Sequence, residues 1–298
     1  MWTNKLLIYF CLVLAMIFWG FSFVGTKISL DGNIQPITLV LIRLIVSGIF
    51  MLILTRSLGI LQNIKKKDIK WFLLIAFFEP LCYFLGETYG LQLVTSTLGA
   101  VLISTIPLFV PWAAWIVFRE KVSFLNLLGI VISIVGVLLI IFEPNISFNV
   151  SLLGIALLFI AVLSAVGYTM VLRHIIKTYS PVTIITWQNI LGIFAFVPLF
   201  FVCDVHLFNI SLFTPKIIIT ILCLGIFPSS LSYVFYSYAV KEFGVNRSTV
   251  FTNLIPVITA IFAYFIMDEE LPLLKVAGIL VVIFALFISQ INKIRIFK

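Results

Sequence analysis

Three ionisable residues lie inside long apolar stretches of this 298-residue chain, namely Arg43, Glu79 and Glu87. A charge at the centre of a bilayer costs roughly 2.5–3.5 kcal/mol on insertion scales, so such residues normally face a bundle interior or a wet cavity. One guanidinium and two carboxyls can bind a charged or zwitterionic solute, or carry a proton. The opposing interpretation is structural: an ion pair that sets helix register, plus one neutral, hydrogen-bonded carboxyl. The residues alone leave both interpretations open.

The depth of each charge along its helix favours one particular pair. At a rise of 1.5 Å per residue, Arg43 and Glu87 lie ~6–9 Å from the outer ends of their helices, whereas Glu79 lies ~18 Å deep. Depth therefore predicts an Arg43–Glu87 ion pair and leaves Glu79 as the less compensated acid. Tyr83 shares a ragged stripe with both glutamates, because positions i, i+4 and i+8 lie on one helix face.

Amides and aromatic rings within the apolar stretches supply the other candidates for substrate contact. A buried amide without a partner is costly, so each one must face a neighbouring helix or water. Hydrogen bonding between helices is the alternative to substrate binding for these amides. Aromatic rings can close over an apolar part of a solute. The full candidate substrate site is Trp19, Arg43, Glu79, Tyr83, Glu87, Trp187, Gln188, Asn189, Tyr233 and Asn253.

Membrane-spanning helices must position these residues. Hydrophobic residues make up 63% of the chain and charged residues 10%, where a soluble domain has about 45–50% and about 25%. Backbone groups in lipid must bond within their own segment, which predicts helices rather than open strands. Stretches long enough to span a bilayer occur at 6–27, 37–57, 70–91, 96–118, 124–142, 152–172, 181–203, 215–239, 245–267 and 272–291.

The distribution of Lys and Arg predicts how these ten spans are oriented. With the N-terminus in the cytoplasm, fifteen of the 19 basic residues lie on the inner side, three lie on the outer side, and Arg43 lies within a span. Basic residues accumulate in cytoplasmic loops, so both termini are predicted to be cytoplasmic. The net charge of +8 reflects this bias. It does not indicate nucleic-acid binding, because no basic stripe alternates with aromatics on a polar face.

The two halves of the chain resemble each other. A shift of 149 residues places Phe118-Arg119-Glu120-Lys121 over Met267-Asp268-Glu269-Glu270, Pro107 over Pro256, and Gly129 over Gly278. Five spans per half mean that the second copy enters the membrane upside down, as in many secondary transporters. The predicted fold is therefore an all-α polytopic membrane protein of ten helices, built as a 5+5 inverted repeat with halves at 1–145 and 146–298.

Prolines at matching positions of the two halves mark candidate hinges. Each proline removes a backbone donor and frees a carbonyl. Pro107 and Pro256 occupy equivalent places in the fourth and ninth spans, and Pro80 and Pro228 break the third and eighth. Paired breaks favour a site or hinge near the midplane, so Pro107 and Pro256 are predicted hinge residues. Kinks without function, satisfied by nearby hydroxyls, are the alternative.

Other motifs predict neither a metal site, nor a cofactor, nor catalysis. The sequence has no H-E-x-x-H motif and no Walker loop. Four cysteines lie in apolar runs without metal-knuckle spacing and are interpreted as buried packing thiols: Cys11, Cys82, Cys203 and Cys223. Gly86-x-x-x-Gly90 allows close helix contact, either within the bundle or across a dimer. The predicted state is a monomer or a weak homodimer.

The order of several short motifs resembles a known family. Phe18-Trp19-Gly20-Phe21-Ser22-Phe23 in the first span precedes Leu41-Ile42-Arg43 in the second, and Phe118-Arg119-Glu120 with Gly129 recurs as Met267-Asp268-Glu269 with Gly278. Together they are similar to the EamA-type family of the drug/metabolite transporter superfamily. The resemblance implies that a solute moves through a central cavity, often in export of amino acids or related metabolites. Gln188 stands where the first half has Arg43, so the cavity is predicted to be asymmetric.

The resulting hypothesis is a secondary transporter in the bacterial cytoplasmic membrane that exports a small amphipathic metabolite, with amino-acid-like solutes as first choice. Its partners are this solute and membrane lipids. Proton-coupled drug efflux is the alternative within the transporter class. An intramembrane lipid-processing enzyme would need a catalytic dyad or metal cluster at one membrane face. A channel would need matching rings of polar residues in both halves, yet Arg43 and Gln188 do not match.

Overall fold

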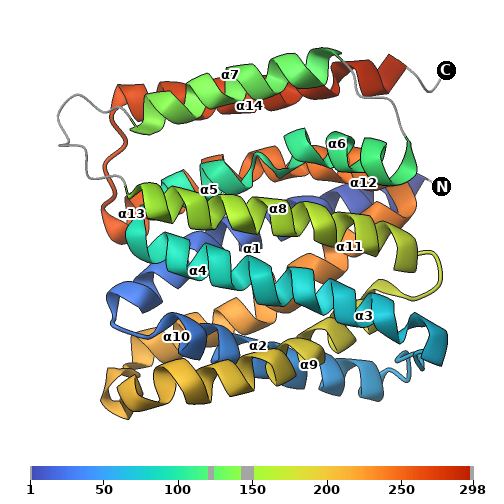
Figure 1. Ribbon diagram of the computed structural model, residues 1–298, viewed down its shortest axis with the longest axis vertical. Coiled ribbons are helices and arrows are strands. Elements are labelled where there is room, and N and C mark those ends of the chain that lie inside the picture. The colour runs from blue at the N-terminus through green and yellow to red at the C-terminus, as the bar shows by residue number, and fades with distance from the viewer. Residues whose placement is uncertain (1, 120–123, 142–150, 296–298) are drawn as a thin grey trace.

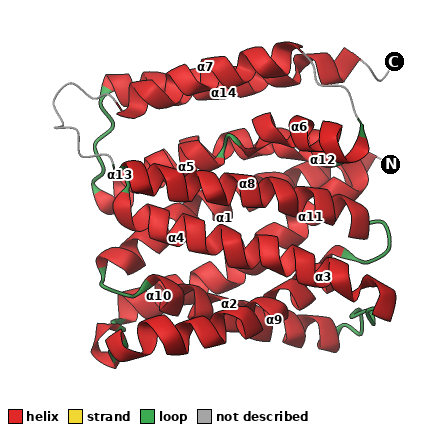
Figure 2. Cartoon of the chain, in the orientation of Figure 1, coloured by secondary structure: helices red, strands yellow, loops and turns green. Residues whose placement is uncertain are grey.

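A computed structural model describes residues 2–119, 124–141 and 151–295, and these residues contain no strand (Figure 2). The described helices form ten consecutive rods: α1 (Trp2–Asp31); α2 (Pro36–Ser57); α3 (Ile69–Ala76), η2 (Phe77–Cys82) and α4 (Tyr83–Leu93); α5 (Ser96–Ile103) and α6 (Ile106–Phe118); α7 (Phe124–Ile141); α8 (Leu152–Ile175); α9 (Pro181–Leu199) and η3 (Phe200–Asp204); α10 (Pro215–Ile226), η6 (Phe227–Ser232) and α11 (Tyr233–Phe243); α12 (Val245–Ser248), η7 (Thr249–Leu254) and α13 (Ile255–Met267); and α14 (Leu273–Arg295).

These rods lie over the ten stretches predicted as spans. Seven described helices are long and apolar enough to cross a membrane, and two shorter apolar helices cover 251–267 and 273–285. The rods lie side by side in one bundle, and the start of α1 and the end of α14 lie at the same end of it (Figure 1). An even number of crossings places both ends on one side, as the charge distribution predicted. The predicted boundary between halves, at 145/146, lies outside the described residues.

The two halves share their helix irregularities. A π-helical turn interrupts the third rod at 77–82 and the eighth at 227–232. The fourth rod breaks between α5 and α6, and the ninth passes through the 3-10 turn η7 before α13 begins. Arg119 (φ 60°) and Asp268 (φ 53°) both end their helices in the left-handed conformation. The doubled sequence motif thus marks a helix C-terminus, where a left-handed residue is common.

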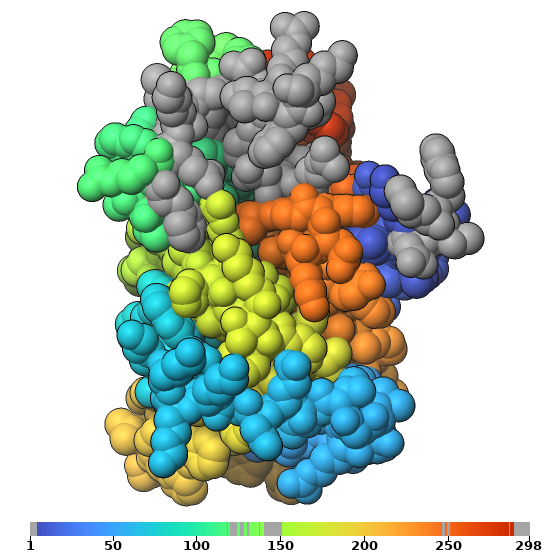
Figure 3. Space-filling view, turned by 90° about the vertical axis from the view of Figure 1, so that its right-hand side faces the viewer, coloured from blue at the N-terminus to red at the C-terminus, as the bar shows by residue number. Residues whose placement is uncertain are grey.

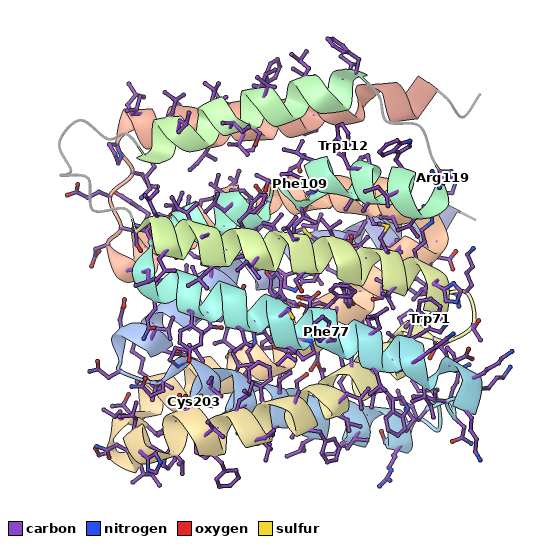
Figure 4. The ribbon with its side chains drawn as sticks, in the orientation of Figure 1. Trp71, Phe77, Phe109, Trp112, Arg119 and Cys203 are labelled. Atoms are coloured by element: carbon purple, nitrogen blue, oxygen red, sulfur yellow. The ribbon has the colours of Figure 1, made fainter. Side chains whose placement is uncertain are left out.

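Glycines set the closest helix contacts inside the bundle. A Cβ on Gly86 would lie 2.6 Å from the backbone oxygen of Leu157, and one on Gly90 would lie 2.7 Å from Leu158 Cγ. The predicted Gly86-x-x-x-Gly90 contact is therefore made between α4 and α8 within one chain. The cysteine prediction was wrong in one respect, because none of the four thiols is fully buried and Cys203 is exposed. Cys203 lies at the opposite end of the bundle from Arg119 (Figure 4).

Gly86→Ala is expected to lower the free energy of unfolding by about 1–3 kcal/mol, as overpacking does. The added methyl meets backbone atoms of α8, which cannot turn aside as a side chain can. Thermal unfolding in detergent measures the effect. Gly48→Ala in α2 is the matched control, because its Cβ would meet only the flexible end of Ile193, at 2.9 Å. Equal unfolding midpoints for the two variants would contradict the close α4–α8 contact.

A hydrogen bond to an ion-paired carboxylate joins the two halves at the predicted outer end. Glu269, in the loop after α13, accepts hydrogen bonds from Ser96 Oγ of α5 (2.8 Å) and Lys275 Nζ of α14 (2.9 Å). Burial by itself raises the pKa of Glu269, but the charge and hydrogen bond of Lys275, with the Ser96 hydroxyl, outweigh it and hold the pKa below the usual value. Lys275 is itself buried.

The lowered pKa of Glu269 predicts a pH-dependent stability. A carboxyl whose pKa is lower in the folded state stabilises the fold above its unfolded pKa, and this contribution is lost as the pH falls through the folded value. Glu269→Gln should therefore lower the unfolding temperature at neutral pH, and the difference from the wild type should shrink as the medium is acidified below about pH 4. A difference that stays constant from neutral pH to pH 3 would argue against this assignment.

Candidate functional site

The two π-helical turns position the polar groups at the centre of the bundle. Glu79 has non-helical dihedral angles (φ −145°, ψ 115°), and Pro80 after it offers no N–H. Ser164 Oγ of α8 donates to the Phe78 carbonyl at 2.6 Å. In the eighth rod, Ser47 Oγ of α2 and Asn189 Nδ2 of α9 donate to the Ser229 carbonyl at 3.1 and 3.2 Å. Side chains from other helices thus donate hydrogen bonds to backbone carbonyls in both π-helical turns, as irregular backbone in a membrane requires.

Arg43 lies at the centre of a buried polar network and is only 2% exposed. Its Nε donates to Ser229 Oγ, and its Nη1 lies 4.0 Å from Glu87 Oε2. The guanidinium carbon lies 4.5 Å from the centre of the Phe84 ring, within the range of a cation–π contact. The predicted Arg43–Glu87 pair is therefore confirmed. At 4.0 Å the pair is electrostatic without a hydrogen bond.

A second layer of hydrogen bonds holds Ser229 in place. Asn189 Nδ2 donates to Ser47 Oγ at 2.6 Å, and the Ser47 and Ser230 hydroxyls lie 2.6 Å apart. Ser230 Oγ donates in turn to the Gly225 carbonyl at 2.9 Å. These contacts link α2, α9 and η6 beneath Arg43. Asn189 acts here through other groups and fixes the position of Ser229, the hydrogen-bond partner of Arg43.

Each of the two buried glutamates has a tyrosine partner. Tyr233 donates to Glu79 Oε1, and Tyr83 donates to Glu87 Oε1 at 3.2 Å. Three further rings surround the Tyr233–Glu79 pair. The Trp19 ring centre lies 5.2 Å from those of Tyr233 and Tyr236, and Tyr168 lies 6.2 Å from Tyr233. Glu79 is 4% exposed and Glu87 2%, so both carboxyls are buried.

These groups line one cavity of about 660 Å³, a volume that includes its open mouth. Its lining comes from both halves: Trp19, Ser22, Phe23, Arg43, Glu79, Tyr83, Phe84, Glu87, Ile103, Ile106, Ala165, Tyr168, Thr169, Tyr233, Tyr236, Thr252 and Ile255. Equivalent positions of the fourth and ninth rods, 149 residues apart, each contribute: Ile103 with Thr252, and Ile106 with Ile255. The halves therefore offer similar positions with different chemistry.

The structure brings together six of the ten predicted substrate residues. Those on the cavity wall are Trp19, Arg43, Glu79, Tyr83, Glu87 and Tyr233. Those outside its lining are Trp187, Gln188, Asn189 and Asn253. Gln188 and Asn253 are nevertheless buried, and Gln188 Oε1 and both polar atoms of Asn253 have no hydrogen-bond partner among the described residues.

The predicted hinge prolines follow the breaks in their rods. Pro107 and Pro256 are the second residues of α6 and α13. At that position a missing N–H leaves no intrahelical bond unmade, because the first turn of a helix has free donors in any case. The chain irregularity lies just before each proline, at Ser104–Thr105 in the fourth rod and in η7 in the ninth.

Sequence reasoning missed Tyr168 and Tyr236 as wall residues. Tyr236 lies one helical turn after Tyr233, and this i, i+3 spacing was a usable signal. Tyr168 occupies the part of the sixth span that corresponds to Trp19-Gly20 in the first. Its aromatic character was the available clue. The described residues contain no cluster of three metal-ligating side chains.

A charged, aromatic cavity at the centre of an apolar helical bundle is typical of a polytopic membrane transporter. The chain belongs to the EamA-like transporter family, whose model matches residues 6–142 and 152–290. The chain is thus an integral, multi-pass membrane transporter and not an enzyme, which sets aside the intramembrane lipid-processing alternative.

Two similar proteins are also described as transporters. An uncharacterized transporter of Archaeoglobus fulgidus is 27% identical over 93% of this chain and 96% of its own length. The uncharacterized transporter YdfC of Bacillus subtilis is 26% identical over 93% of the chain and 90% of its own. A chloroplastic WAT1-related protein of Arabidopsis thaliana is 27% identical over 93% and 68%. One crystal structure has a TM-score of 0.67 at 9% identity, covering 93% of this chain and 98% of its own. That likeness concerns the fold alone.

Proposed function

We propose that this transporter exports a small amphipathic metabolite by alternating access through the central cavity, with amino-acid-like zwitterions as the first candidates. The observation that carries the proposal is the presence of Arg43, Glu79 and Glu87 on one aromatic cavity wall. A zwitterion brings one charge of each sign, and this wall offers one cation and two carboxyls. An apolar side chain of the solute would pack against Trp19 and Tyr236.

The balance of charges gives the bound solute an orientation. Arg43 is already close to Glu87 and bonded to Ser229, whereas Tyr233 is the one hydrogen-bond donor to Glu79 among the described residues. The ammonium group of the solute would therefore bind at Glu79, and its carboxylate would approach the free edge of the Arg43 guanidinium. Binding of a positive group near Glu79 would also offset the excess of carboxyls on this wall.

Alternating access is the mechanism that the two halves support. We propose that residues 1–145 and 146–298 exchange conformations, with the breaks before Pro107 and Pro256 as the hinges. The α5–α6 break and η7 carry cavity-wall residues at equivalent positions, so a change of bend at either break would reshape the cavity. One chain completes the cavity, so a monomer is sufficient. The similarity to the bacterial transporter YdfC supports a location in the cytoplasmic membrane.

Exchange of a lipophilic amine for protons is the second candidate function. The rings of Trp19, Tyr168 and Tyr236 around the Tyr233–Glu79 pair favour it, because aromatic faces attract organic cations. In this case Glu79 would carry a proton in one direction and the cation in the other.

Counterflow into proteoliposomes tests both candidates. Vesicles preloaded with unlabelled amino acid should accumulate the labelled amino acid transiently and with saturation. Vesicles with an imposed pH gradient and a fluorescent lipophilic amine test the second candidate. Saturable counterflow of amines alone would replace the first candidate by the second. Flux that rises linearly with concentration, without counterflow, would contradict a carrier of either kind.

A further inference from the structure

The end of the bundle that carries both termini has a dense cluster of exposed cations. Here it is called the basic surface, and it consists of Arg56, Lys65, Lys66, Lys67, Lys70 and Lys177, all exposed. Five of these residues lie at or between the end of α2 and the start of α3, and Lys177 lies in the turn between α8 and α9. Figure 3 faces this end and shows the light-blue atoms of the first segment beside the yellow-green atoms of the α8–α9 turn.

Hydrogen bonds between the two segments hold the basic surface in one arrangement. Tyr179 OH accepts from Lys65 N at 3.1 Å. Gln62 accepts from Ser180 N at 2.7 Å, and its own N–H donates to Thr183 Oγ1 at 3.1 Å. The α2–α3 segment belongs to the first half of the chain and the α8–α9 turn to the second. The cations thus lie on a hydrogen-bonded contact between the two halves.

The only acidic residue in these two segments does not neutralise the cluster. Asp68 is half-buried, and its carboxylate accepts a hydrogen bond from Tyr179 OH at 2.8 Å. Burial and the hydrogen bond to Asp68 raise the pKa of Tyr179, against the effect of the Lys65 N–H, so this phenol stays protonated and remains a donor. The lysines consequently face solvent without a carboxylate partner in either segment.

Apolar side chains beside the cations place this surface at the lipid boundary. Leu58, Ile60 and Ile69 are 60%, 41% and 45% exposed. The Trp71 ring lies 5.4 Å from Lys70 Nζ and 4.3 Å from the His174 ring, at the same end of the bundle as Arg119 (Figure 4). Tryptophan is typical of the headgroup level of a bilayer. The combination suits a ligand with an anionic head and an apolar tail.

We infer that the basic surface binds anionic phospholipid head groups of the cytoplasmic leaflet, and that a bound lipid bridges the two halves of the transporter. Clusters of four to eight basic residues next to a membrane helix attract anionic lipids by the same electrostatics. The hydrogen bonds between the two segments add a structural consequence, because a lipid bound beside them lies next to both halves. Anionic lipid should therefore stabilise the transporter beyond what a neutral lipid does.

Thermal unfolding of the full chain in a neutral detergent tests this inference. Phosphatidylglycerol should raise the unfolding midpoint with saturation, whereas phosphatidylcholine and inorganic phosphate should not. The triple substitution Lys65→Gln, Lys66→Gln and Lys67→Gln should weaken lipid binding, so that the half-saturating concentration of phosphatidylglycerol rises by roughly tenfold or more. The matched control is the triple Lys5→Gln, Arg119→Gln and Lys241→Gln, which removes as much charge from exposed positions at the same end and should respond like the wild type.

The outcomes separate the possible ligands. Equal stabilisation by inorganic phosphate would show a site for free anions and overturn the lipid assignment. Equal stabilisation by phosphatidylcholine, or equal loss in both triple variants, would overturn a local anionic site. The wild type alone also gives a decisive result: because exposed charges are screened within about 3 Å at 1 M salt, high salt should suppress the phosphatidylglycerol effect. An effect that persists unchanged at high salt would contradict the inference even without any variant.

Discussion

Arg43→Gln is expected to abolish transport, with a loss of at least about 100-fold, because removing one partner of a buried charge pair costs roughly 2–5 kcal/mol. Glu87 would keep its buried carboxyl without the guanidinium 4.0 Å away. The Ser229 hydroxyl would lose the donor that now binds it. Transport in proteoliposomes and the thermal shift on adding solute measure the functional part of the loss.

A double substitution separates the structural role of Arg43 from its role in binding. Arg43→Gln with Glu87→Gln removes both charges of the pair, so most of the stability lost in the single variant should return, because Glu87 is no longer left as a buried charge without its partner. Substrate binding should not return, since the double variant has no cation for a solute carboxylate. Normal transport by the double variant would mean that the pair serves the fold alone, and would remove Arg43 from the substrate site.

Glu79→Gln is expected to abolish any dependence of transport on pH and to reduce transport at every pH by about 100-fold or more, by the same loss of a buried charged partner. Glutamine has nearly the same shape and keeps an acceptor for Tyr233, so the fold should be preserved. What it loses is the ability to bind a proton or to offer a negative charge to an ammonium group. Transport rates measured from pH 5 to pH 9 give the profile.

Glu87→Gln provides the matched control for Glu79. Both carboxyls are buried on the same cavity wall and both accept from a tyrosine, but it is Glu87 that forms the ion pair with Arg43. The Glu87 variant should transport more slowly and keep the pH profile of the wild type. An unchanged pH profile in the Glu79 variant would rule out proton carriage by Glu79. A profile lost in both variants would assign proton binding to the two carboxyls jointly.

The depth of each charged side chain along its membrane helix could be predicted from the sequence, because the rise per residue of a helix is constant. Arg43 and Glu87 were placed at one level on this basis, and the structure pairs them. The same reasoning separated Glu79 from this pair, and in the structure Glu79 is bonded to Tyr233 instead. The doubled helix ending at Arg119 and Asp268 was readable for a similar reason, since a helix stop is a local property.

Rotation about the helix axis was not predictable in the same way. A π-helical turn shifts the face that all later residues present, because its hydrogen bonds span one residue more than those of an α-helix. Such turns at 77–82 and 227–232 decide which side chains of α4 and α11 reach the cavity. Gln188 and Asn189 were predicted to contact the substrate, yet Asn189 faces Ser47 and Ser229.

By itself the sequence determined that this protein lies in lipid, where its apolar helices run along the chain, and at which depth in those helices its buried charges lie, because these follow from composition and from the regular geometry of a helix. Only the tertiary structure decided which polar groups share the cavity. That choice depends on the π-helical turns, on close glycine contacts such as that between α4 and α8, and on side chains of one half that bond the backbone of the other. Contacts between residues far apart in the chain have no fixed spacing in the sequence.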